Sequence, residues 1–189
     1  MLQTLASVRL SQVKIEDARS ALTRSISLWK DLDPEDDVVP DFPTRVSLAR
    51  LLMEAEMESE AMEVLERLAL EDDQSVEACY LGGWCLHLLA EKRKHAANGA
   101  MEIAESEQNE VLATLKASRS WLLNTLKLYR LLEYEDERLK SHTEELVEDL
   151  NKVLGPPPEE GKEDEEEDEW EGIEDDASED GMDEEMGGT

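Results

Sequence analysis

The chain has 189 residues, of which 36% are charged and only 4% are aromatic, and its formal net charge is −30. This excess of acidic residues argues against direct binding to nucleic acid, because affinity for phosphate backbones depends on clustered Lys and Arg. No apolar stretch approaches the roughly 18 residues that a membrane span needs, and no signal-peptide pattern follows Met1, so we expect a soluble intracellular protein that does not bind membranes.

Residues 1–154 have a composition and a pattern typical of helices. Leu, Ala, Glu, Met and Arg dominate there, whereas Gly and Pro are rare. Apolar residues recur at spacings of three, four and seven, as at Leu139, Leu146, Leu150 and Val153, and no segment alternates strictly between apolar and polar residues. The sequence therefore predicts an all-α fold without a sheet.

Small residues recur in a fixed frame along this helical part. Leu5 and Ala6 form a pair with Ala18 placed 13 residues after Leu5, and Leu48 and Ala49 form a pair with Ala61 at the same offset. A third pair, Leu81 and Gly82, begins 33 residues after Leu48. A period of about 34 residues is typical of tetratricopeptide repeats, in which small side chains let paired helices approach closely and neighbouring pairs bury one core. The sequence therefore predicts a right-handed solenoid.

Several segments depart from the repeat frame. Residues 31–44 are rich in Asp and Pro and indicate a loop, and the polar residues 91–99 indicate an interruption of the third unit. A long helix is then expected from about Met101 to Glu133. The last predicted helix runs from about Glu135 to Leu154, where Gly155 and three prolines give a stop signal. We expect this helix to cap the open end of the stack.

The composition changes at Gly155. Residues 155–189 contain 18 acidic residues and a single basic one, so they carry −17 of the total −30 and leave −13 to residues 1–154. Seven consecutive acidic residues occupy positions 163–169. A segment with so few apolar groups cannot bury enough surface to offset the entropy lost on ordering. The sequence thus predicts a tetratricopeptide-like repeat domain over 1–154 and a disordered acidic tail over 155–189.

The residues needed for catalysis or for a metal site do not converge in the sequence. His87, His95 and His142 have no Cys, Asp or Glu at metal-ligand or triad spacing, and no glycine loop for phosphate is present. Cys79 and Cys85, six residues apart on one helix, point in different directions and are expected to be packed thiols of a reducing compartment. We predict that the protein is not an enzyme and has no cofactor.

The expected groove of the repeats lacks the basic residues with which some tetratricopeptide chaperones hold acidic carboxyl termini. Of the positions that correspond to that clamp, only Arg50 has a suitable side chain. The lining that remains is apolar and acidic: Met53, Glu54, Glu58, Glu77, Tyr80, Leu86 and His87. Such a surface suits a basic, partly apolar peptide, and these seven residues are the candidate client-binding site.

Several short strings, in their order along the chain, resemble those of a known family. They are LASVRLSQ at residues 5–12, EDA at 16–18, LGGWC at 81–85 and EWEGI at 169–173. Together they are similar to the fungal tetratricopeptide assembly chaperones dedicated to large-subunit ribosomal protein L-four, and the resemblance spans nearly the whole chain. Such chaperones usually start with further repeats, whereas this chain opens inside its first unit, as expected of a shortened or divergent member.

The resemblance implies a role in ribosome biogenesis. The protein would capture its newly made basic client, shield a loop or extension of that client, and deliver it from the cytoplasm to nuclear pre-ribosomes. Whether a nuclear import receptor joins through the client stays open. Physical reasoning agrees, because basic ribosomal segments bind RNA indiscriminately before assembly and an acidic groove competes with RNA for them.

The residues alone leave two other functions open. An acidic chaperone for histones or other basic cargo would bind several basic proteins about equally, and a general tetratricopeptide scaffold would ignore basic clients. Solubility by itself explains many acidic tails. Trp170 is the residue of the tail that this simple explanation accounts for least well.

Overall fold

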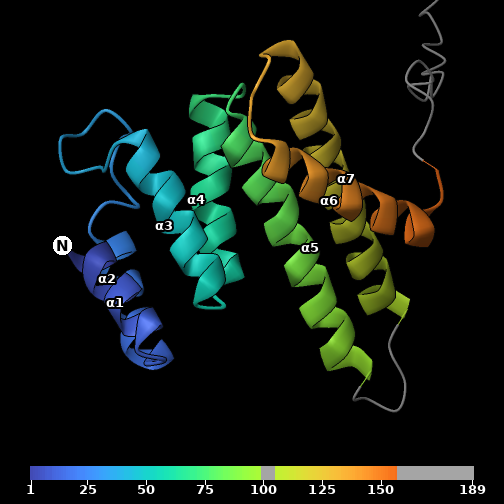
Figure 1. Cartoon of the computed structure of the whole chain (residues 1–189). Coiled ribbons are helices and arrows are strands. Elements are labelled where there is room, and N and C mark those ends of the chain that lie inside the picture. The colour runs from blue at the N-terminus through green and yellow to red at the C-terminus, as the bar shows by residue number, and fades with distance from the viewer. Residues whose placement is uncertain (99–104, 157–189) are drawn as a thin grey trace, which may run out of the picture. The chain divides into compact units, whose positions relative to one another are not determined.

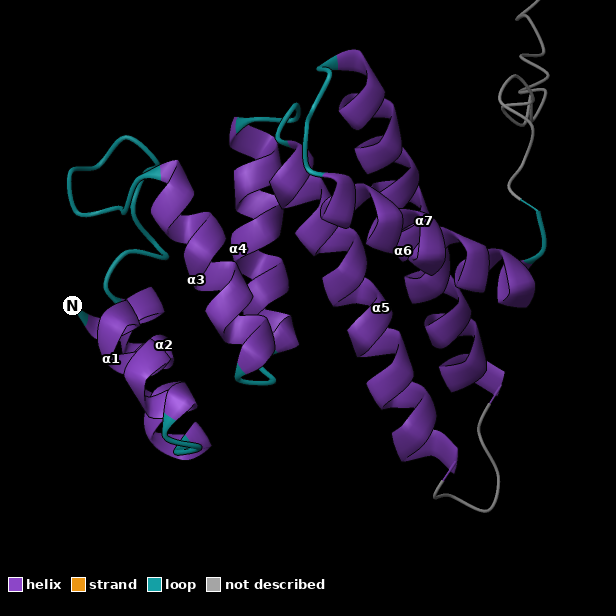
Figure 2. Cartoon of the chain, in the orientation of Figure 1, coloured by secondary structure: helices purple, strands orange, loops and turns teal. Residues whose placement is uncertain are grey.

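The structure is a computed structural model, and it describes residues 1–98 and 105–156. Over these residues it is all-α, with seven helices and no strand, as Figures 1 and 2 show. The helices are α1 (Leu2–Ser11), α2 (Ile15–Ser27), α3 (Phe42–Glu54), α4 (Glu58–Glu71), α5 (Val76–Asn98), α6 (Glu105–Leu131) and α7 (Glu137–Leu154). The predicted all-α class is therefore confirmed. Apart from Gly155 and Pro156, the segment predicted to be a disordered acidic tail lies outside the described residues.

The helices pack in the order in which the chain makes them. α1 packs on α2, α3 on α4 and α5 on α6, and the contact of α4 with α5 joins the second pair to the third. α7 packs mainly on α6 and also touches α5. One apolar core cluster runs through α1 to α5, and two further clusters lie among α5, α6 and α7. In the part of the chain that the structure describes, no helix is long and apolar enough to cross a membrane.

The small residues of the predicted frame lie where helices meet. Ala6, Ala18, Ala49 and Ala61 are each 0% exposed. Leu48 and Leu81 are also buried, whereas Leu5 at the equivalent place is 44% exposed. The difference has a simple cause, because α3 and α5 each follow a helix pair that covers their leucine and no described helix precedes α1.

The loop between α2 and α3 spans residues 28–41 and so lies three residues earlier than the sequence predicted. Helix α3 begins at Phe42, inside the segment expected to be a loop, because the carboxylate of Asp41 accepts a hydrogen bond from the backbone N–H of Thr44 at 3.1 Å. Pro43 in the first turn favours the same start. The beginning of the loop is fixed by Arg67 of α4, whose guanidinium donates to the carbonyl oxygens of Lys30 at 3.0 Å and Leu32 at 2.7 Å.

The predicted interruption at residues 91–99 is wrong as far as the structure describes them, because α5 continues unbroken to Asn98. The polar side chains from Lys92 to His95 are exposed, and two of them contact neighbouring helices. Lys92 contacts the Glu58 carboxylate of α4 at 2.7 Å, and Arg93 donates to the Thr114 hydroxyl of α6 at 3.2 Å. The last helix follows its prediction more closely, since Asp136 caps its start and Gly155 with φ 78° ends it.

Candidate functional site

A groove of about 710 Å³ lies between α3, α5 and the first turns of α7. Its lining combines apolar, aromatic and charged side chains from three helices and from the residue that caps α7. These residues are Arg50, Met53 and Glu54 of α3, Tyr80, Leu81, Trp84 and Leu88 of α5, and Asp136, Arg138, Leu139 and His142 of the α7 segment. The groove is the candidate site because it gathers several of the predicted residues.

The floor of the groove is aromatic. Tyr80, Trp84 and Leu88 follow one another at four-residue spacing and therefore share one face of α5. The Tyr80 hydroxyl lies 2.8 Å from Nδ1 of His142, and the His142 ring stands at 78° to Trp84 with the ring centroids 5.2 Å apart. Burial raises the pKa of the Tyr80 hydroxyl, so this phenol stays neutral at physiological pH and can donate to the imidazole.

The rim of the groove carries both signs of charge. Arg50 of α3 forms an ion pair with Glu77 of α5, which neutralises one of the predicted acidic residues. Glu54 is exposed and has no ion-pair partner among residues 1–98 and 105–156. On the opposite side, the Asp136 carboxylate accepts hydrogen bonds from the backbone N–H groups of Arg138 at 3.0 Å and Leu139 at 3.1 Å.

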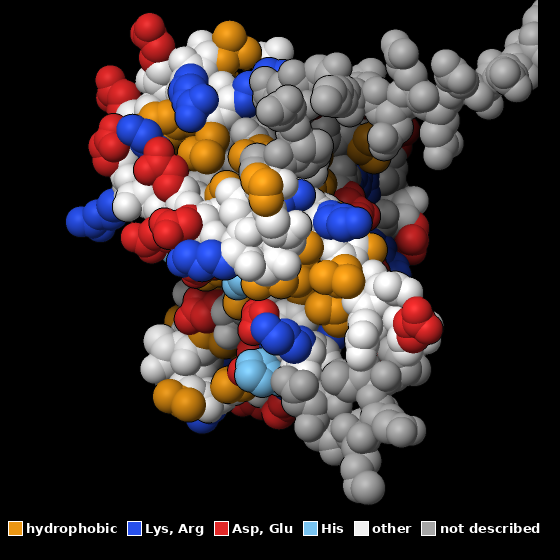
Figure 3. All heavy atoms as spheres, turned by 90° about the vertical axis from the view of Figure 1, so that its right-hand side faces the viewer, with side chains coloured by type: hydrophobic (Ala, Val, Ile, Leu, Met, Phe, Trp, Pro, Cys, Tyr) orange, Lys and Arg blue, Asp and Glu red, His pale blue; other side chains and the backbone are white. Residues whose placement is uncertain are grey.

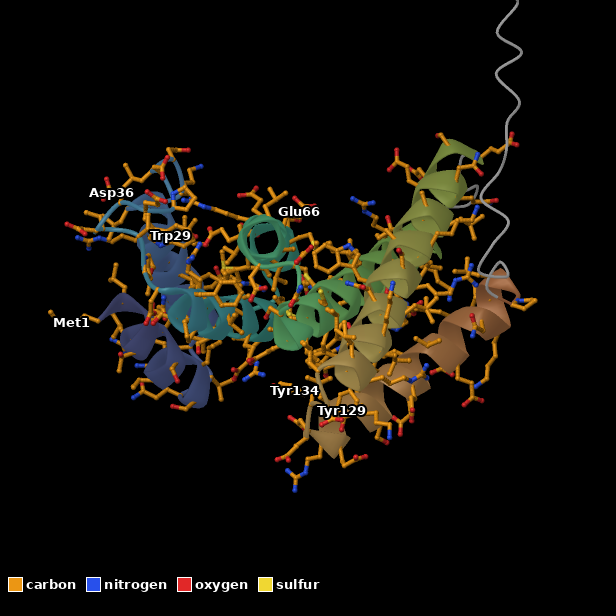
Figure 4. All side chains as sticks on the ribbon, turned by 90° about the horizontal axis from the view of Figure 1, so that it is seen from above. Met1, Trp29, Asp36, Glu66, Tyr129 and Tyr134 are labelled. Atoms are coloured by element: carbon orange, nitrogen blue, oxygen red, sulfur yellow. The ribbon has the colours of Figure 1, made fainter. Side chains whose placement is uncertain are left out.

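Acidic residues gather at the end of the groove where α6 turns into α7. The turn contains Glu133, Glu135, Asp136 and Glu137. Burial raises the pKa of the Tyr134 hydroxyl in this turn, and the negative charges of Glu77 and Asp136 raise it further. Figure 4 shows Tyr134 beside Tyr129, whose ring centroid lies 5.9 Å away, and shows Glu66 of α4 on the opposite side of the molecule. This end of the groove therefore carries several carboxylates, beside the cations Arg50 and Arg138 that also line the groove.

The outer face around α6 and α7 differs from the groove. In Figure 3, acidic and basic side chains alternate there around small apolar areas, and the visible coloured residues form no extended patch of one sign. A mixed surface of this kind gives no preference for a strongly charged partner. The described residues also contain no group of three or more His, Cys, Asp and Glu side chains that could hold a metal ion.

The structure brings together three of the seven candidate residues, namely Met53, Glu54 and Tyr80, and places Glu77 at their edge through its pair with Arg50. The other three lie elsewhere. Glu58 is 4% exposed and pairs with Lys92, and Leu86 packs against the core of α1 to α5. His87 lies near Asp149 of α7, whose pKa is lowered mainly by Lys152 and in small part by His87.

Sequence reasoning also missed residues that line the groove. Trp84 could have been found, because it lies one helical turn after Tyr80 and therefore on the same face of α5. Asp136, Arg138 and His142 could not, since their place depends on where α7 crosses α5. The two cysteines are buried and free as expected, and burial raises the pKa of the Cys85 thiol to about 12.

Comparison with known proteins places the chain beside two curated fungal proteins, each named "Probable assembly chaperone of rpl4". The protein from Emericella nidulans is 59% identical over 182 residues, which cover 94% of this chain and 48% of that protein. The one from Schizosaccharomyces pombe is 39% identical over 171 residues, which cover 90% of this chain and 48% of that protein. The chain thus spans about half the length of these relatives. No family model matches the sequence.

A solved structure is also similar. It is described as "Assembly Chaperone of RpL4 (Acl4) (Residues 1-338)", and it matches with 58% sequence identity and a TM-score of 0.50. The match covers 50% of this chain and 34% of the solved chain. The resemblance inferred from the short strings is therefore confirmed.

Proposed function

Since nearly the whole chain matches fungal proteins named as probable assembly chaperones of rpl4, we propose that it acts as such a chaperone for large-subunit ribosomal protein L4. In this proposal the protein binds the newly made client, shields a loop or extension of it, and releases it to pre-ribosomes. It works in the cytoplasm and the nucleus, without catalysis. A nuclear import receptor reaches the complex through the client.

The proposal includes the fold of the repeats. The pairs α1–α2, α3–α4 and α5–α6 would be three tetratricopeptide-like units of a right-handed solenoid, and α7 its cap. The burial of Ala6, Ala18, Ala49 and Ala61 supports this register. So does Gly82, where an added Cβ would lie 2.3 Å from Cε3 of Trp121 on α6.

The single observation that carries the function is the groove with its aromatic floor and its acidic end. Residues 1–154 have a net charge of −13, so the field of the domain attracts a basic segment before contact. Inside the groove, Tyr80, Trp84 and Leu88 offer apolar surface while Glu54 and Asp136 accept hydrogen bonds from the client. The acidic segment 155–189 would add a weaker attraction that salt screens.

The test reverses one charge in the groove. Glu54→Lys replaces attraction by repulsion at the rim, and we expect it to weaken binding of ribosomal protein L4 at 0.15 M salt by about tenfold, which corresponds to ~1.4 kcal/mol. Glu54 is preferred to Glu77 because Arg50 already neutralises Glu77. Binding is measured by isothermal titration calorimetry, and circular dichroism checks that the variant stays helical.

Two further variants complete the design. Glu66→Lys makes the same charge change on α4, away from the groove (Figure 4), and should leave the affinity within about twofold. Replacing Glu165, Glu166 and Glu167 by Lys should weaken binding less than Glu54→Lys does. If the groove variant keeps full affinity while the tail variant loses it, the protein is a general acidic chaperone, and binding of histones with equal affinity would indicate the same.

A further inference from the structure

We propose that the floor formed by Tyr80, Trp84 and His142 is a pocket for the guanidinium group of one arginine side chain. The proposal rests on the proposed function only for the origin of that arginine, which would belong to the basic segment of the client. The pocket itself is defined by side chains of the described chain. It therefore permits a test that does not need the client.

The rings offer a suitable surface. The Tyr80 and Trp84 rings form an adjacent tilted pair, inclined by 34° with their centroids 5.8 Å apart. The His142 ring stands at 75° to Tyr80 and at 78° to Trp84, and its contact with both rings fixes their orientation. All three side chains line the groove and are only partly buried. A planar guanidinium can stack on the face of one of these rings, whereas the tetrahedral ammonium of lysine cannot.

Two carboxylates line the same groove as the rings and could bind the N–H groups of a stacked guanidinium. Asp136 lines the groove from the α7 side, and its negative charge raises the pKa of the Tyr80 hydroxyl, whereas the charge of Arg50 lowers it. Glu54 lines the groove from α3. An arginine that stacks on one of the rings can therefore donate hydrogen bonds to a carboxylate of the same groove, and these charge-assisted bonds are stronger than neutral ones. Rings and carboxylates together favour a cation over a neutral side chain.

No cation of the described chain lies over these rings. Among residues 1–98 and 105–156, the cation–π contacts are Arg67 over Trp29 at 5.5 Å and Lys140 over Tyr129 at 5.6 Å, and neither is in the groove. Arg50 lines the groove but is paired with Glu77. Arg138 lies on the exposed rim at the start of α7. The pocket is thus open to a cation from another molecule.

The pocket is tested with small probes on the wild-type protein. The indole N–H signals of the four tryptophans are followed by NMR while N-acetyl-arginine amide is added at constant ionic strength, and Trp84→Phe assigns the Trp84 signal. We expect this signal to shift in a saturable way while those of Trp29 and Trp121 stay in place. N-acetyl-citrulline amide has the same shape without charge and should cause no shift. An equal shift with citrulline amide, or none with arginine amide, overturns the pocket.

A lysine probe tests the choice of guanidinium. N-acetyl-lysine amide should bind several-fold more weakly than the arginine probe, and equal affinity would overturn the assignment to arginine. In the client assay, Trp84→Leu should weaken binding of ribosomal protein L4 by about 2- to 30-fold, the range expected for loss of one cation–π contact. Trp84→Phe keeps an aromatic face and should weaken it less.

The failures of the two proposals can be told apart. If arginine amide shifts Trp84 but ribosomal protein L4 does not bind at all, the pocket stands and the choice of client is wrong. If Glu54→Lys weakens client binding but Trp84→Leu does not, the function stands and the arginine pocket is wrong. Circular dichroism of Trp84→Leu ensures that lost binding does not come from lost folding, since Trp84 also packs against two of the core clusters.

Discussion

At the scale of single residues, Arg45 and Glu71 form the most deeply placed ion pair of the described chain. Arg45 of α3 is 4% exposed, and its guanidinium donates two hydrogen bonds to the Glu71 carboxylate at the end of α4, at 2.6 and 2.5 Å. These hydrogen bonds lower the pKa of Glu71, against the opposing effect of burial. Because the pKa is lower in the folded state, the pair stabilises the fold above about pH 4.5 and loses this effect as the carboxylate is protonated.

We therefore expect Glu71→Gln to lower the free energy of unfolding by about 2–3 kcal/mol at pH 7, because it leaves the buried Arg45 without its counter-charge. The difference from the wild type should shrink as the pH falls below 4.5, where Glu71 of the wild type also loses its charge. Urea denaturation across this pH range measures the difference in the free energy of unfolding. Glu66→Gln, on the exposed face of the same helix, is the control and should change stability by less than about 0.5 kcal/mol. A difference that is independent of pH would contradict the assignment.

How far the site could be predicted also depends on single residues. Met53 and Glu54 line the groove, and their position could be predicted because it follows from the repeat frame of α3. Glu58 was misplaced, because a glutamate beside a helix start looks exposed in the sequence and only the structure reveals its partner Lys92 on α5. His142 could not be assigned, because it contacts Tyr80, 62 positions away in the chain, only where two helices cross.

At the scale of helices, α5 and α6 approach closely at a pair of glycines. A Cβ on Gly82 would lie 2.3 Å from Cε3 of Trp121, and the buried hydroxyl of Ser118 donates to the carbonyl oxygen of Gly83 at 2.7 Å. A side chain larger than hydrogen at this place on α5 would overlap the indole ring, so the ring or the helix would have to shift.

Gly82→Ala should therefore destabilise the protein by about 1–3 kcal/mol through overpacking, although alanine is the better helix former. Thermal denaturation followed by circular dichroism measures the effect. The same substitution in a Trp121→Ala background should cost much less, because the clashing ring is gone and the two changes are coupled. Equal costs in both backgrounds would show that the clash with Trp121 is not the cause.

Helix boundaries were the part of the fold that the sequence predicted least well. The all-α class and the start and end of α7 could be predicted, because apolar periodicity and stop signals such as Gly155 are local features of the sequence. The continuation of α5 through residues 91–98 was not, since it depends on partners such as Glu58 and Thr114 on other helices. A polar run therefore indicates a break only when no neighbouring helix offers such partners.

At the scale of the whole molecule, hydrogen bonds hold the helical part together as far as its last described residues. Arg119 of α6 is 9% exposed, and its guanidinium donates to the carbonyl oxygen of Gly155 at 2.8 Å and to the side chain of Asn151 at 3.3 Å. The composition, in contrast, changes at Gly155 to almost exclusively acidic and small residues. A cut after Pro156 thus preserves the contacts of Arg119 and removes most of the acidic segment.

Removal of residues 157–189 should leave the midpoint of thermal unfolding within about 2 °C of the full chain. The reason is that a strongly acidic segment with few apolar residues contributes little burial. Circular dichroism at 222 nm follows the transition, at about 0.15 M salt so that the lost negative charge has little effect. A decrease of more than about 5 °C, on the order of 1–2 kcal/mol for a domain of this size, would show that the segment packs on the helices.

The order in which neighbouring helices pack also has a consequence for synthesis on the ribosome. Because α1 packs mainly on α2 and α3 mainly on α4, these two pairs can close while the rest is still being translated. The groove cannot, because Asp136 and His142 arrive only with α7. We therefore expect the protein to bind a basic peptide only when its own translation is nearly complete. An incomplete chain then does not capture the RNA-binding segments of the ribosome that synthesises it.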